Sequence, residues 1–519
     1  DKGAARFAKA IVNREKIAVF GDYDVDGACS SALMARFLRA HGLNPEIYIP
    51  DRIFEGYGPN VAAIEKLIAD GAQLIVTVDC GGTSHDPLGA AKDLNTDVVV
   101  IDHHQMEEVL PPAAAVINPN RQDDLSGQGH LCAAGVVFLF LIAVTRCLRS
   151  EGWYGDERPE PDLLRLIDLV ALATICDVVP LTGVNRAFVS QGLKIMHRRA
   201  NAGLRALADA AALKSAPTPY HLGYIMGPRI NAGGRIGDAA LGARLLANDD
   251  DADAARIAAQ LTQLNRERQE MEQSCCEEAF AMAEIRLEAN PDLPVIIVGS
   301  EDWHKGLVGL VASRLMDRFR RPALAIAWNA ENGEGTGSAR SIAGADIGQA
   351  VRAGLAAGHL VKGGGHAMAA GVTLAREKLE AFEIFLSDHL GTMVTAARES
   401  SSLYIDGALT PEAATIELVD LIEKAGPFGA GNPSPRFVFP AHRVTSVRQM
   451  GEAHLRCTLR SAGGSSIGAI AFRCLGTPLG DALQKDDGRP AHIAGRLQRD
   501  SWGGREKIEV LIEDLAFPM

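Results

Sequence analysis

The sequence has few cysteines for its length and lacks a Cys-x-x-Cys motif. Its nine cysteines are scattered over 519 residues without a Cys-x-x-Cys pair, which is unlike the dense spacing of a secreted disulfide scaffold. We therefore expect reduced thiols and a cytoplasmic location. The longest apolar stretch, Cys132 to Val144, is shorter than the ~20 residues that a membrane-spanning helix needs. Since no signal-like segment opens the chain, the sequence predicts a protein that is neither membrane-bound nor exported.

The chain also lacks an excess of basic residues. It has 52 Lys and Arg against 65 Asp and Glu, a formal net charge of -13. This balance excludes general electrostatic attraction to nucleic acid, so a polyanionic substrate must meet a local basic surface. The length and the 47% hydrophobic content are typical of a globular chain with three or four domains. The sequence is expected to enter a strand almost directly after Asp1, which suggests a trimmed natural N-terminus.

The first half of the chain changes from alternating strands and helices to helices alone. Strands are expected at residues 16–20, 46–49, 74–78 and 98–101, and helices at residues 30–41 and 61–69. Such alternation predicts a parallel α/β sheet. Beyond Gly129 helices are expected at residues 131–148, 163–174 and 186–196. The first predicted domain covers residues 1–250.

A long amphipathic helix is predicted over residues 254–287, where apolar side chains recur at steps of three and four. It defines a connecting segment, residues 251–290, that leads into a second and smaller α/β domain, residues 291–399. The stretch Glu399–Ser402 is a candidate boundary. After it, short strands at residues 444–450, 455–459, 466–472, 492–497 and 508–511 predict an OB-like β-barrel over residues 400–519.

Four acidic clusters each follow a run of mainly apolar residues. They are Asp22-Tyr23-Asp24-Val25-Asp26-Gly27, Val78-Asp79-Cys80-Gly81, Asp102-His103-His104 and Cys176-Asp177. Three of them stand at the carboxyl ends of predicted parallel strands, where ligands collect. Carboxylates, imidazoles and water are ligands of Mn²⁺ and Mg²⁺, and two close ions can share a carboxylate. The clusters therefore predict a divalent-metal phosphoesterase site.

Three of these clusters have an ordinary structural alternative. The hexapeptide at residues 22–27 could be a helix N-cap or a calcium-like acidic loop, and Asp79 alone could cap a strand end. A lone histidine more often satisfies the core or the surface than it binds a metal. An Asp-His-His run at a strand end favours the metal, because it joins a carboxylate and two imidazoles at one place.

Two glycine-containing segments are suited to binding phosphate. Gly363-Gly364-Gly365-His366 offers unobstructed N–H groups and an imidazole, and the segment 227–235 offers two guanidinium groups beside a flexible backbone. A tight turn and a solvated loop are the alternatives. The segments 303–306 and 338–341 add an aromatic ring, basic groups and hydroxyls that could bind a base or a phosphate. Trp303 could equally belong to the core.

The order and spacing of these motifs resemble the DHH phosphoesterase family. The four acidic clusters look like its four motifs, and the segments 227–235 and 363–371 look like those of its branch that degrades single-stranded DNA. The resemblance covers nearly the whole chain. It implies an α/β fold with a parallel-sheet DHH domain and its helical C-terminal part, a DHH-associated substrate-binding domain and an OB-like nucleic-acid-binding domain.

The resemblance implies a 5′-to-3′ exonuclease that depends on one or two Mn²⁺ or Mg²⁺ ions, releases 5′-mononucleotides and acts in DNA recombination and repair. Metal ligation is implied for Asp22, Asp24, Asp26, Asp79, Asp102, His103 and Asp177, and catalytic roles for Asp79, Asp102, His103 and His104. Substrate binding is implied for Arg229, Asn231, Arg235, Arg340, Ser341 and His366. The chemistry of the segments above adds Trp303, His304, Gly364 and Gly365 to the predicted substrate-binding residues.

Other functions remain as alternatives. Pyrophosphatases of the same superfamily are expected to carry a histidine four residues before Asp24, where this chain has Phe20. A DHH phosphodiesterase for short oligoribonucleotides or cyclic dinucleotides is the main alternative, although such relatives end after the associated domain and this chain continues to residue 519. A non-catalytic scaffold protein is disfavoured, because every ligand position is filled. Family-level partners are single-stranded DNA, a single-stranded-DNA-binding protein and a RecQ-type helicase, and we expect a monomer.

Overall fold

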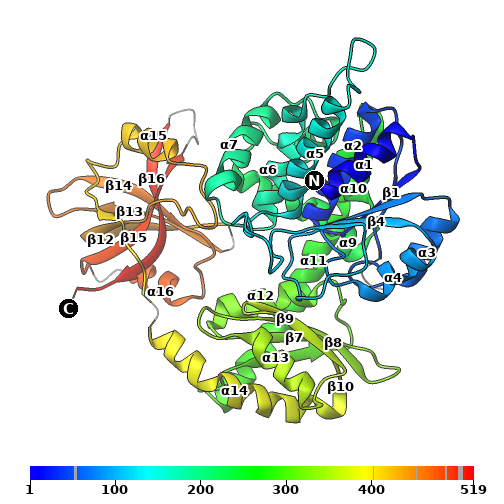
Figure 1. Ribbon diagram of the computed structural model, residues 1–519. Helices are drawn as coiled ribbons and strands as arrows, with labels where there is room; N and C mark the ends of the chain where they lie inside the picture. The colour runs from blue at the N-terminus through cyan, green and yellow to red at the C-terminus, as the bar shows by residue number, and fades with distance from the viewer. Residues whose placement is uncertain (52–54, 401, 452, 486–487, 501–505, 519) are drawn as a thin grey trace. The chain divides into compact units, whose positions relative to one another are not determined.

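A computed structural model describes residues 1–51, 55–400, 402–451, 453–485, 488–500 and 506–518 (Figure 1). The chain forms two compact units. The first contains Asp1–Val179 and Ala187–Ser401, and the second contains Pro180–Arg186 and Ser402–Met519. Ser401, part of the predicted boundary, lies outside the described residues.

The first unit opens with a five-stranded parallel sheet of order β2-β1-β3-β4-β5. Its strands are β1 (Ile17–Gly21), β2 (Glu46–Tyr48), β3 (Leu74–Val78), β4 (Asp97–Ile101) and β5 (Ala115–Ile117). Every residue of β1 and β3 is buried, which explains their continuous apolar runs. Gly21 pairs with Val78, and Val78 with Ile101, so three strands end side by side. The predicted parallel α/β fold is confirmed.

Helices cover both faces of this sheet. They are α1 (Lys2–Val12), α2 (Val25–Ala40), α3 (Val61–Ala69), α4 (His85–Asp93) and α5 (Ala133–Ser150), while α6 (Ile167–Cys176) packs against α2 and α5. Helices α3 and α4 share a core with one face, while α2 and α5 contact strands from the other. The prediction that a strand follows Asp1 almost directly is wrong. Helix α1 precedes β1 and buries Phe7 and Ile11, an i, i+4 apolar pair that marks a helix face.

Helix α5 contains the longest apolar stretch of the sequence. Within the described residues it is the one helix that is long and apolar enough to cross a membrane, and 61% of its 18 residues are buried in the protein. It packs against α1, α2 and α6, and the ring of Phe140 meets that of Phe7 edge-on at 5.5 Å. In this structure α5 is therefore a core helix.

A helical region leads from the first sheet to the second. It comprises η1 (Leu163–Leu166), α7 (Gly183–His197), α8 (Ala202–Ala210), the π-helix η2 (His221–Met226), α9 (Gly227–Ile236), α10 (Leu241–Ala247) and α11 (Asp251–Ala289). The predicted flexible backbone at residues 227–235 is wrong, because these residues form α9. Pro228 stands in its first turn, where a proline suits a helix. The long α11 spans 39 residues and is capped by Asp250.

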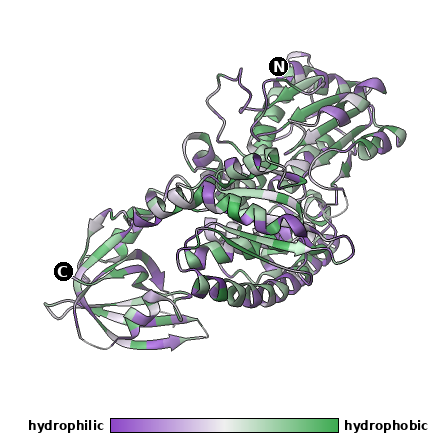
Figure 2. Ribbon diagram, turned by 90° about the horizontal axis from the view of Figure 1, so that it is seen from below, coloured by the Kyte–Doolittle hydropathy of each residue, from purple (hydrophilic) through white to green (hydrophobic). Residues whose placement is uncertain are grey.

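The second sheet of this unit has the order β6-β7-β8-β10-β9. Its strands are β6 (Ile296–Ser300), β7 (Ala323–Trp328), β8 (Glu334–Arg340), β9 (Lys362–His366) and β10 (Ala369–Ala375). Helices α13 (Ile347–Ala356) and α14 (Leu379–Glu399) cover one face, and α11 with α12 (Val308–Phe319) covers β6 and β7 on the other. A short helix, η3 (Arg376–Lys378), precedes α14. Figure 2 shows helices with one hydrophobic and one hydrophilic side, as expected of helices that cover a sheet.

The second unit is a small β-barrel. Its strands are β11 (Gly407–Ala408), β12 (Phe437–Met450), β13 (His454–Arg460), β14 (Ser466–Ala471), β15 (Ala491–Asp500) and β16 (Lys507–Ala516). Pairing of β12 with both β13 and β15 closes the sheet. Two short helices, α15 (Ile416–Lys424) and α16 (Pro478–Gln484), accompany it. Closure leaves Phe439, Leu459 and Val510 in a common core, and the predicted OB-like architecture is confirmed.

Candidate metal centre

The first acidic cluster forms the turn between β1 and α2. The side chain of Asp24 caps α2 by accepting hydrogen bonds from the N–H groups of Asp26, at 2.8 Å, and Gly27, at 3.1 Å. A Cβ atom at Gly27 would lie 2.4 Å from the carbonyl oxygen of Asp22, so the turn requires glycine there. The N-cap alternative therefore holds for Asp24, and the same turn buries Asp26 to 1% exposure.

Asp79 follows β3 in a strained backbone conformation. Its φ is +63°, a left-handed value that is uncommon outside glycine and that clusters at functional sites. Its N–H donates to the carbonyl oxygen of Ile101 at 3.0 Å, which ties it to the end of β4. Asp79 is buried and faces the first acidic cluster, so the strained turn directs a carboxylate toward other carboxylates.

Asp102 orients the two histidines that follow it. Its Oδ1 accepts from the His103 N–H at 2.7 Å, the His104 N–H at 3.2 Å and the His104 ring Nδ1 at 2.8 Å. Its Oδ2 accepts from the Gly82 N–H at 2.9 Å. Because Oδ1 of Asp102 already accepts three hydrogen bonds from the protein, this geometry suits Asp102 to orienting His103 and His104 more than to direct metal ligation.

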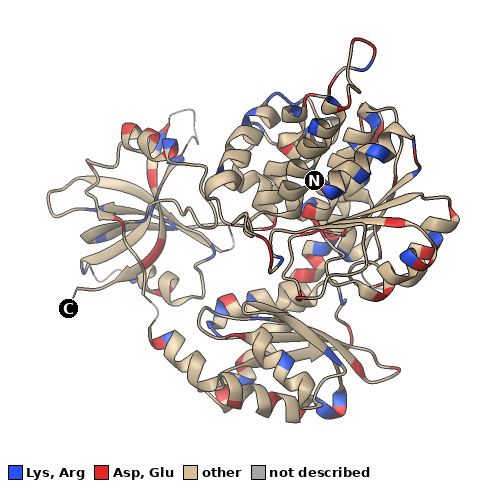
Figure 3. Cartoon of the chain, in the orientation of Figure 1, with Lys and Arg blue, Asp and Glu red and all other residues tan. Residues whose placement is uncertain are grey.

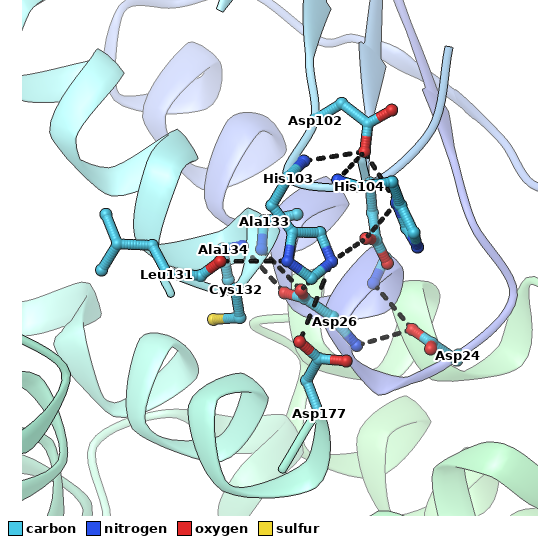
Figure 4. Close-up of polar contacts among 12 residues, drawn as sticks. Asp24, Asp26, Asp102, His103, His104, Leu131, Cys132, Ala133, Ala134 and Asp177 are labelled. Atoms are coloured by element: carbon cyan, nitrogen blue, oxygen red, sulfur yellow. Dashed lines mark hydrogen bonds and ion pairs between the residues drawn. The ribbon is translucent and has the colours of Figure 1, made fainter. Parts of the chain in front are cut away.

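His103 lies at the centre of the buried carboxylates (Figure 4). Its Nε2 is 3.3 Å from Asp79 Oδ1 and 3.8 Å from both Asp26 Oδ2 and Asp177 Oδ2. Asp177 reaches the site from the C-terminal end of α6. Three groups each bring three potential ligand atoms within 4.8 Å of one another: Asp79, His103 and His104; Asp26, His103 and Asp177; Asp22, Asp24 and Asp79.

The electrostatics of this cluster favour a cation. Burial raises the pKa of Asp26 and of Asp79, and burial together with the charges of Asp26 and Asp24 raises the pKa of Asp177 to about 8. The buried oxygens Asp79 Oδ1 and Asp177 Oδ2 accept no hydrogen bond from the described part of the chain. Carboxylates packed this closely are costly unless positive charge compensates them. The residues thus fit a hard or borderline divalent ion.

Asp102 and His104 form a charged pair beside the cluster. Burial opposes both charges, but the hydrogen bond between the side chains lowers the pKa of Asp102 to about 2 and raises the pKa of His104 to about 9. Tyr57 also reaches this pair. Its hydroxyl donates to the carbonyl oxygen of Asp79 at 3.1 Å and lies 3.2 Å from His104 Nδ1. The sequence carried no signal for Tyr57, which stands in a loop far from every motif.

Two asparagines hold the main chain of the histidines. Asn118 Nδ2 donates to the His104 carbonyl at 2.9 Å, and Asn120 Nδ2 donates to the His103 carbonyl at 2.5 Å. Both were missed by sequence reasoning. The polar run Asn118-Pro119-Asn120 directly after β5 was a usable signal, but β5 itself was not predicted.

Helix α9 carries three of the residues predicted to bind substrate, namely Arg229, Asn231 and Arg235. Its Gly234 lies so close to the first acidic cluster that a Cβ atom there would be 2.7 Å from the Tyr23 carbonyl oxygen. Arg235 Nη1 donates to the Gly306 carbonyl at 3.0 Å, which connects α9 to the segment before α12. The structure therefore places this helix beside the acidic turn.

Two predicted substrate-binding side chains are not available to a ligand. Trp303 is 5% exposed and its Nε1 donates to Glu278 at 2.7 Å, so it belongs to the core shared by α11 and α12. Ser341 is fully buried, and its hydroxyl donates to the Ala345 carbonyl at 2.6 Å. Both predictions are wrong, because the second sheet buries these positions in a packing that local sequence does not reveal.

One of the remaining predicted residues, Gly364, lines a hollow of about 570 Å³ on the second sheet. The hollow is lined by Lys305, Gly306, Val308, Thr336, Gly337, Ser338, Lys362, Gly363, Gly364, Gly371, Val372 and Thr373. The triple glycine is part of strand β9 and not a turn, and its Gly364 forms part of the wall. Gly365 and His366 follow it, exposed at the end of the strand.

Two further predicted residues flank this region. Arg340 Nη1 donates to Ser338 Oγ at 2.9 Å, and His304 Nδ1 accepts from the Gly306 N–H at 3.1 Å. Lys305 and Lys362 are exposed and supply positive charge at the hollow itself. Figure 3 shows acidic and basic residues interspersed over the helices of this unit, so attraction of a polyanion depends on such local groups.

Three family models match the chain. They are the DHH family, N-terminal domain, over residues 16–174; the DHHA1 domain over residues 292–391; and the RecJ OB domain over residues 405–514. Together they reach from the first sheet to the barrel.

Several similar proteins carry the name RecJ. The single-stranded-DNA-specific exonuclease RecJ of Escherichia coli K12 is 38% identical over 520 residues, covering 96% of this chain and 87% of the relative. That of Dickeya dadantii is 36% identical, covering 98% and 88%. The crystal structure of RecJ in complex with Mn²⁺ from Thermus thermophilus is 29% identical with a TM-score of 0.80, covering 100% of this chain and 72% of that one. The chain belongs to the RecJ family of DHH phosphoesterases.

Proposed function

We propose that this protein is a metal-dependent exonuclease that hydrolyses single-stranded DNA from its 5′ end and releases 5′-mononucleotides. The observation that carries the proposal is the buried convergence of Asp26, Asp79, His103 and Asp177 in a chain whose full-length relatives are named single-stranded-DNA-specific exonucleases. The 5′-to-3′ polarity and the role in DNA recombination and repair rest on membership of the family.

One or two Mn²⁺ or Mg²⁺ ions would be held by the clustered side chains, namely Asp22, Asp24, Asp26, Asp79, His103 and Asp177. Crystal structures of Thermus thermophilus RecJ contain each of these ions. A bound divalent ion supplies activation of water and charge neutralisation at the phosphoryl group.

His104 is the proton-carrying residue of the proposed mechanism. Asp102 accepts a hydrogen bond from its Nδ1 at 2.8 Å and holds the imidazole in one orientation. This leaves Nε2 of His104 to donate a proton to a phosphoryl or leaving oxygen. Asp102 thus acts through His104, while His103 and Asp79 belong to the ligand set.

Substrate binding is assigned to the surfaces around the hollow and α9. Arg229, Asn231 and Arg235 lie on the helix that adjoins the acidic turn. His304, Arg340, Gly364, Gly365 and His366 stand in the second α/β domain, whose exposed lysines and strand N–H groups suit phosphate binding. We assign the DHH domain to residues 1–250, the connecting helix to 251–290, the associated domain to 291–399 and the nucleic-acid-binding barrel to 400–519.

The barrel separates this proposal from its main alternative. An enzyme for short oligoribonucleotides or cyclic dinucleotides needs no added binding surface, whereas OB folds bind extended single strands. The match of residues 405–514 to the RecJ OB domain therefore favours a long polymer. We further propose that the protein acts as a monomer in the cytoplasm, together with a single-stranded-DNA-binding protein and a RecQ-type helicase.

A direct test uses end-labelled oligonucleotides. The protein is incubated with Mn²⁺ and with a 5′-labelled or a 3′-labelled single strand, beside a duplex, a dinucleotide and pyrophosphate. Immediate release of the 5′ label as a mononucleotide, with progressive shortening of the 3′-labelled strand, supports the proposal. Cleavage of the dinucleotide alone would support the small-substrate alternative, and release of the 3′ label first would contradict the polarity.

A further inference from the structure

One turn of the chain contacts two of the candidate metal ligands at once. This turn, residues 129–134, leads into α5 and is drawn beside the cluster in Figure 4. The carbonyl oxygen of Leu131 accepts a hydrogen bond from His103 Nδ1 at 3.0 Å. The N–H groups of Ala133 and Ala134 donate to Asp26 Oδ2 and Oδ1 at 2.6 Å and 2.8 Å.

The contact with Leu131 selects one form of the His103 ring. A carbonyl oxygen can only accept, so Nδ1 must carry the proton. In the neutral imidazole Nε2 is then left with its lone pair, and this atom faces Asp79, Asp26 and Asp177. The turn thereby holds His103 in the tautomer and orientation that a metal ligand requires.

The contact with Asp26 fixes both oxygens of its carboxylate. Ala133 and Ala134 are the first two residues of α5, where the N–H groups have no partner inside the helix and the helix dipole favours negative charge. Asp26 is almost fully buried among other carboxylates, so these two N–H groups supply compensation for its charge. Each oxygen retains a lone pair that can bind an ion.

Asn120 joins the turn to the main chain of His103. Its Nδ2 donates to the carbonyl oxygens of both His103, at 2.5 Å, and Gly129, at 3.0 Å. The N–H of Asn120 donates in turn to Asn118 Oδ1 at 2.7 Å. The side-chain amide of Asn120 therefore fixes the position of His103 relative to the turn.

We propose that residues 129–134, tied to His103 by Asn120, are a positioning element that sets the affinity of the centre for divalent ions. The proposal rests on the proposed function in taking Asp26 and His103 as ligands. Ala133, through its N–H, and Asn120, through its side chain, are its positioning residues. Loosening either one should weaken ion binding while every proposed ligand side chain remains present.

The substitution Ala133→Pro tests the backbone contact. Proline is tolerated at the first position of a helix, and Cys132 already has φ -74° and ψ 163°, values that suit a residue before proline. The substitution removes the N–H that binds Asp26 Oδ2. Val61→Pro is the matched control, because Val61 is the exposed first residue of α3 and its preceding Asn60 is also extended.

Mn²⁺ binding to the metal-free full chain is measured by calorimetry and by electron paramagnetic resonance. We expect Ala133→Pro to raise the Kd for Mn²⁺ about 10-fold or more, as for other outer partners of metal ligands, and to alter the Mn²⁺ spectrum. Val61→Pro should leave the Kd within about twofold of the unmodified chain, since a tolerated first-turn proline has no contact with the centre. Excess Mn²⁺ should restore nuclease activity to Ala133→Pro.

Asn120→Ala provides a second variant, and circular dichroism establishes that each variant is folded. If Ala133→Pro does not fold, the Kd of Asn120→Ala decides, and it should also rise. A folded variant at either position with an unchanged Mn²⁺ Kd and spectrum would overturn the proposal. If the unmodified chain bound Mn²⁺ but did not cleave single-stranded DNA, the proposed function would fail, while the Kd values would still judge the positioning element.

Discussion

Replacing Asp177 by Asn should stabilise the metal-free protein while impairing its function. Asp177 packs against Asp26 and His103 at the end of α6, and asparagine replaces its carboxylate by a neutral group of similar size. Burial and the neighbouring carboxylates raise its pKa to about 8. A carboxyl whose pKa is higher in the folded than in the unfolded state destabilises the fold once it is deprotonated, so the penalty grows as the pH rises from about 4 toward 8.

The size of this effect follows from the shift. From the ordinary value of 3.8 to about 8, at about 1.4 kcal/mol for each pH unit, the upper limit at pH 8 is on the order of 5 kcal/mol. Carboxylates that share one site also share protons, so we expect about 2 kcal/mol for Asp177→Asn. Near pH 4 the two proteins should differ little.

Thermal unfolding in EDTA at pH 5 and pH 8 measures this difference. We expect the first transition of Asp177→Asn to lie a few degrees above that of the unmodified protein at pH 8 and to approach it at pH 5. Mn²⁺ should raise the transition of the unmodified protein but hardly that of the variant, and exonuclease activity should fall at least ~100-fold. A variant that is less stable at pH 8 and still responds fully to Mn²⁺ would refute the claim that the Asp177 carboxylate destabilises the metal-free protein and binds the ion.

Three further predictions concern single residues. In the metal-free protein Asp102→Asn should lower the pKa of His104 from about 9 to about 6.5 or below, because burial then opposes its charge without the bond to Asp102. NMR of labelled histidine measures this pKa, and an unchanged value would show that another group sets it. Burial raises the pKa of Asp168 to about 7, so its carboxylate should destabilise the fold as the pH rises from about 4 to 7. Asp168→Asn should therefore raise the melting temperature at pH 8 but not at pH 4.5, and an equal rise at both pH values would contradict this. Trp303→Phe removes the bond to Glu278 and should cost about 1 kcal/mol without changing the Kd for single-stranded DNA in a binding titration, whereas a large loss of affinity would return Trp303 to the substrate site.

Much of the metal centre could be predicted because it lies at strand ends. The strands β1, β3 and β4 are short apolar runs, and each is followed at once by an acidic residue. These parallel strands pair in register and end together. The pattern of short apolar runs therefore predicts from the sequence that Asp22, Asp79 and Asp102 lie at one edge of the sheet.

The roles of the individual side chains in the metal centre could not be predicted in the same way. Whether a carboxylate faces an ion or a protein donor depends on which N–H groups surround it, and those of Gly82, His103 and His104 determine this for Asp102. Tyr57 and Asn120 reach the site from loops whose path depends on tertiary packing. No local pattern marks Tyr57, and the signal at Asn118-Pro119-Asn120 depends on predicting β5.

In the second sheet, residue type alone did not predict the conformation of residues 363–365 or the burial of Trp303. The glycines at 363–365 predict a phosphate-binding segment, with a tight turn as the alternative. They form an edge strand paired with β10, since a sheet accepts glycine where backbones or ligands approach closely. Trp303 stands among basic and polar residues but fills the space between α11 and the sheet. A single aromatic residue in a loop carries no periodicity that would separate core from surface.

The most direct test of the account is a crystal structure of the protein grown with Mn²⁺ and recorded at a wavelength that reveals its anomalous scattering. The account predicts one or two manganese peaks in contact with the side chains of Asp26, Asp79, His103 and Asp177. Peaks elsewhere, or an empty cluster at saturating Mn²⁺, would contradict the claim that these distant parts of the chain form a metal centre.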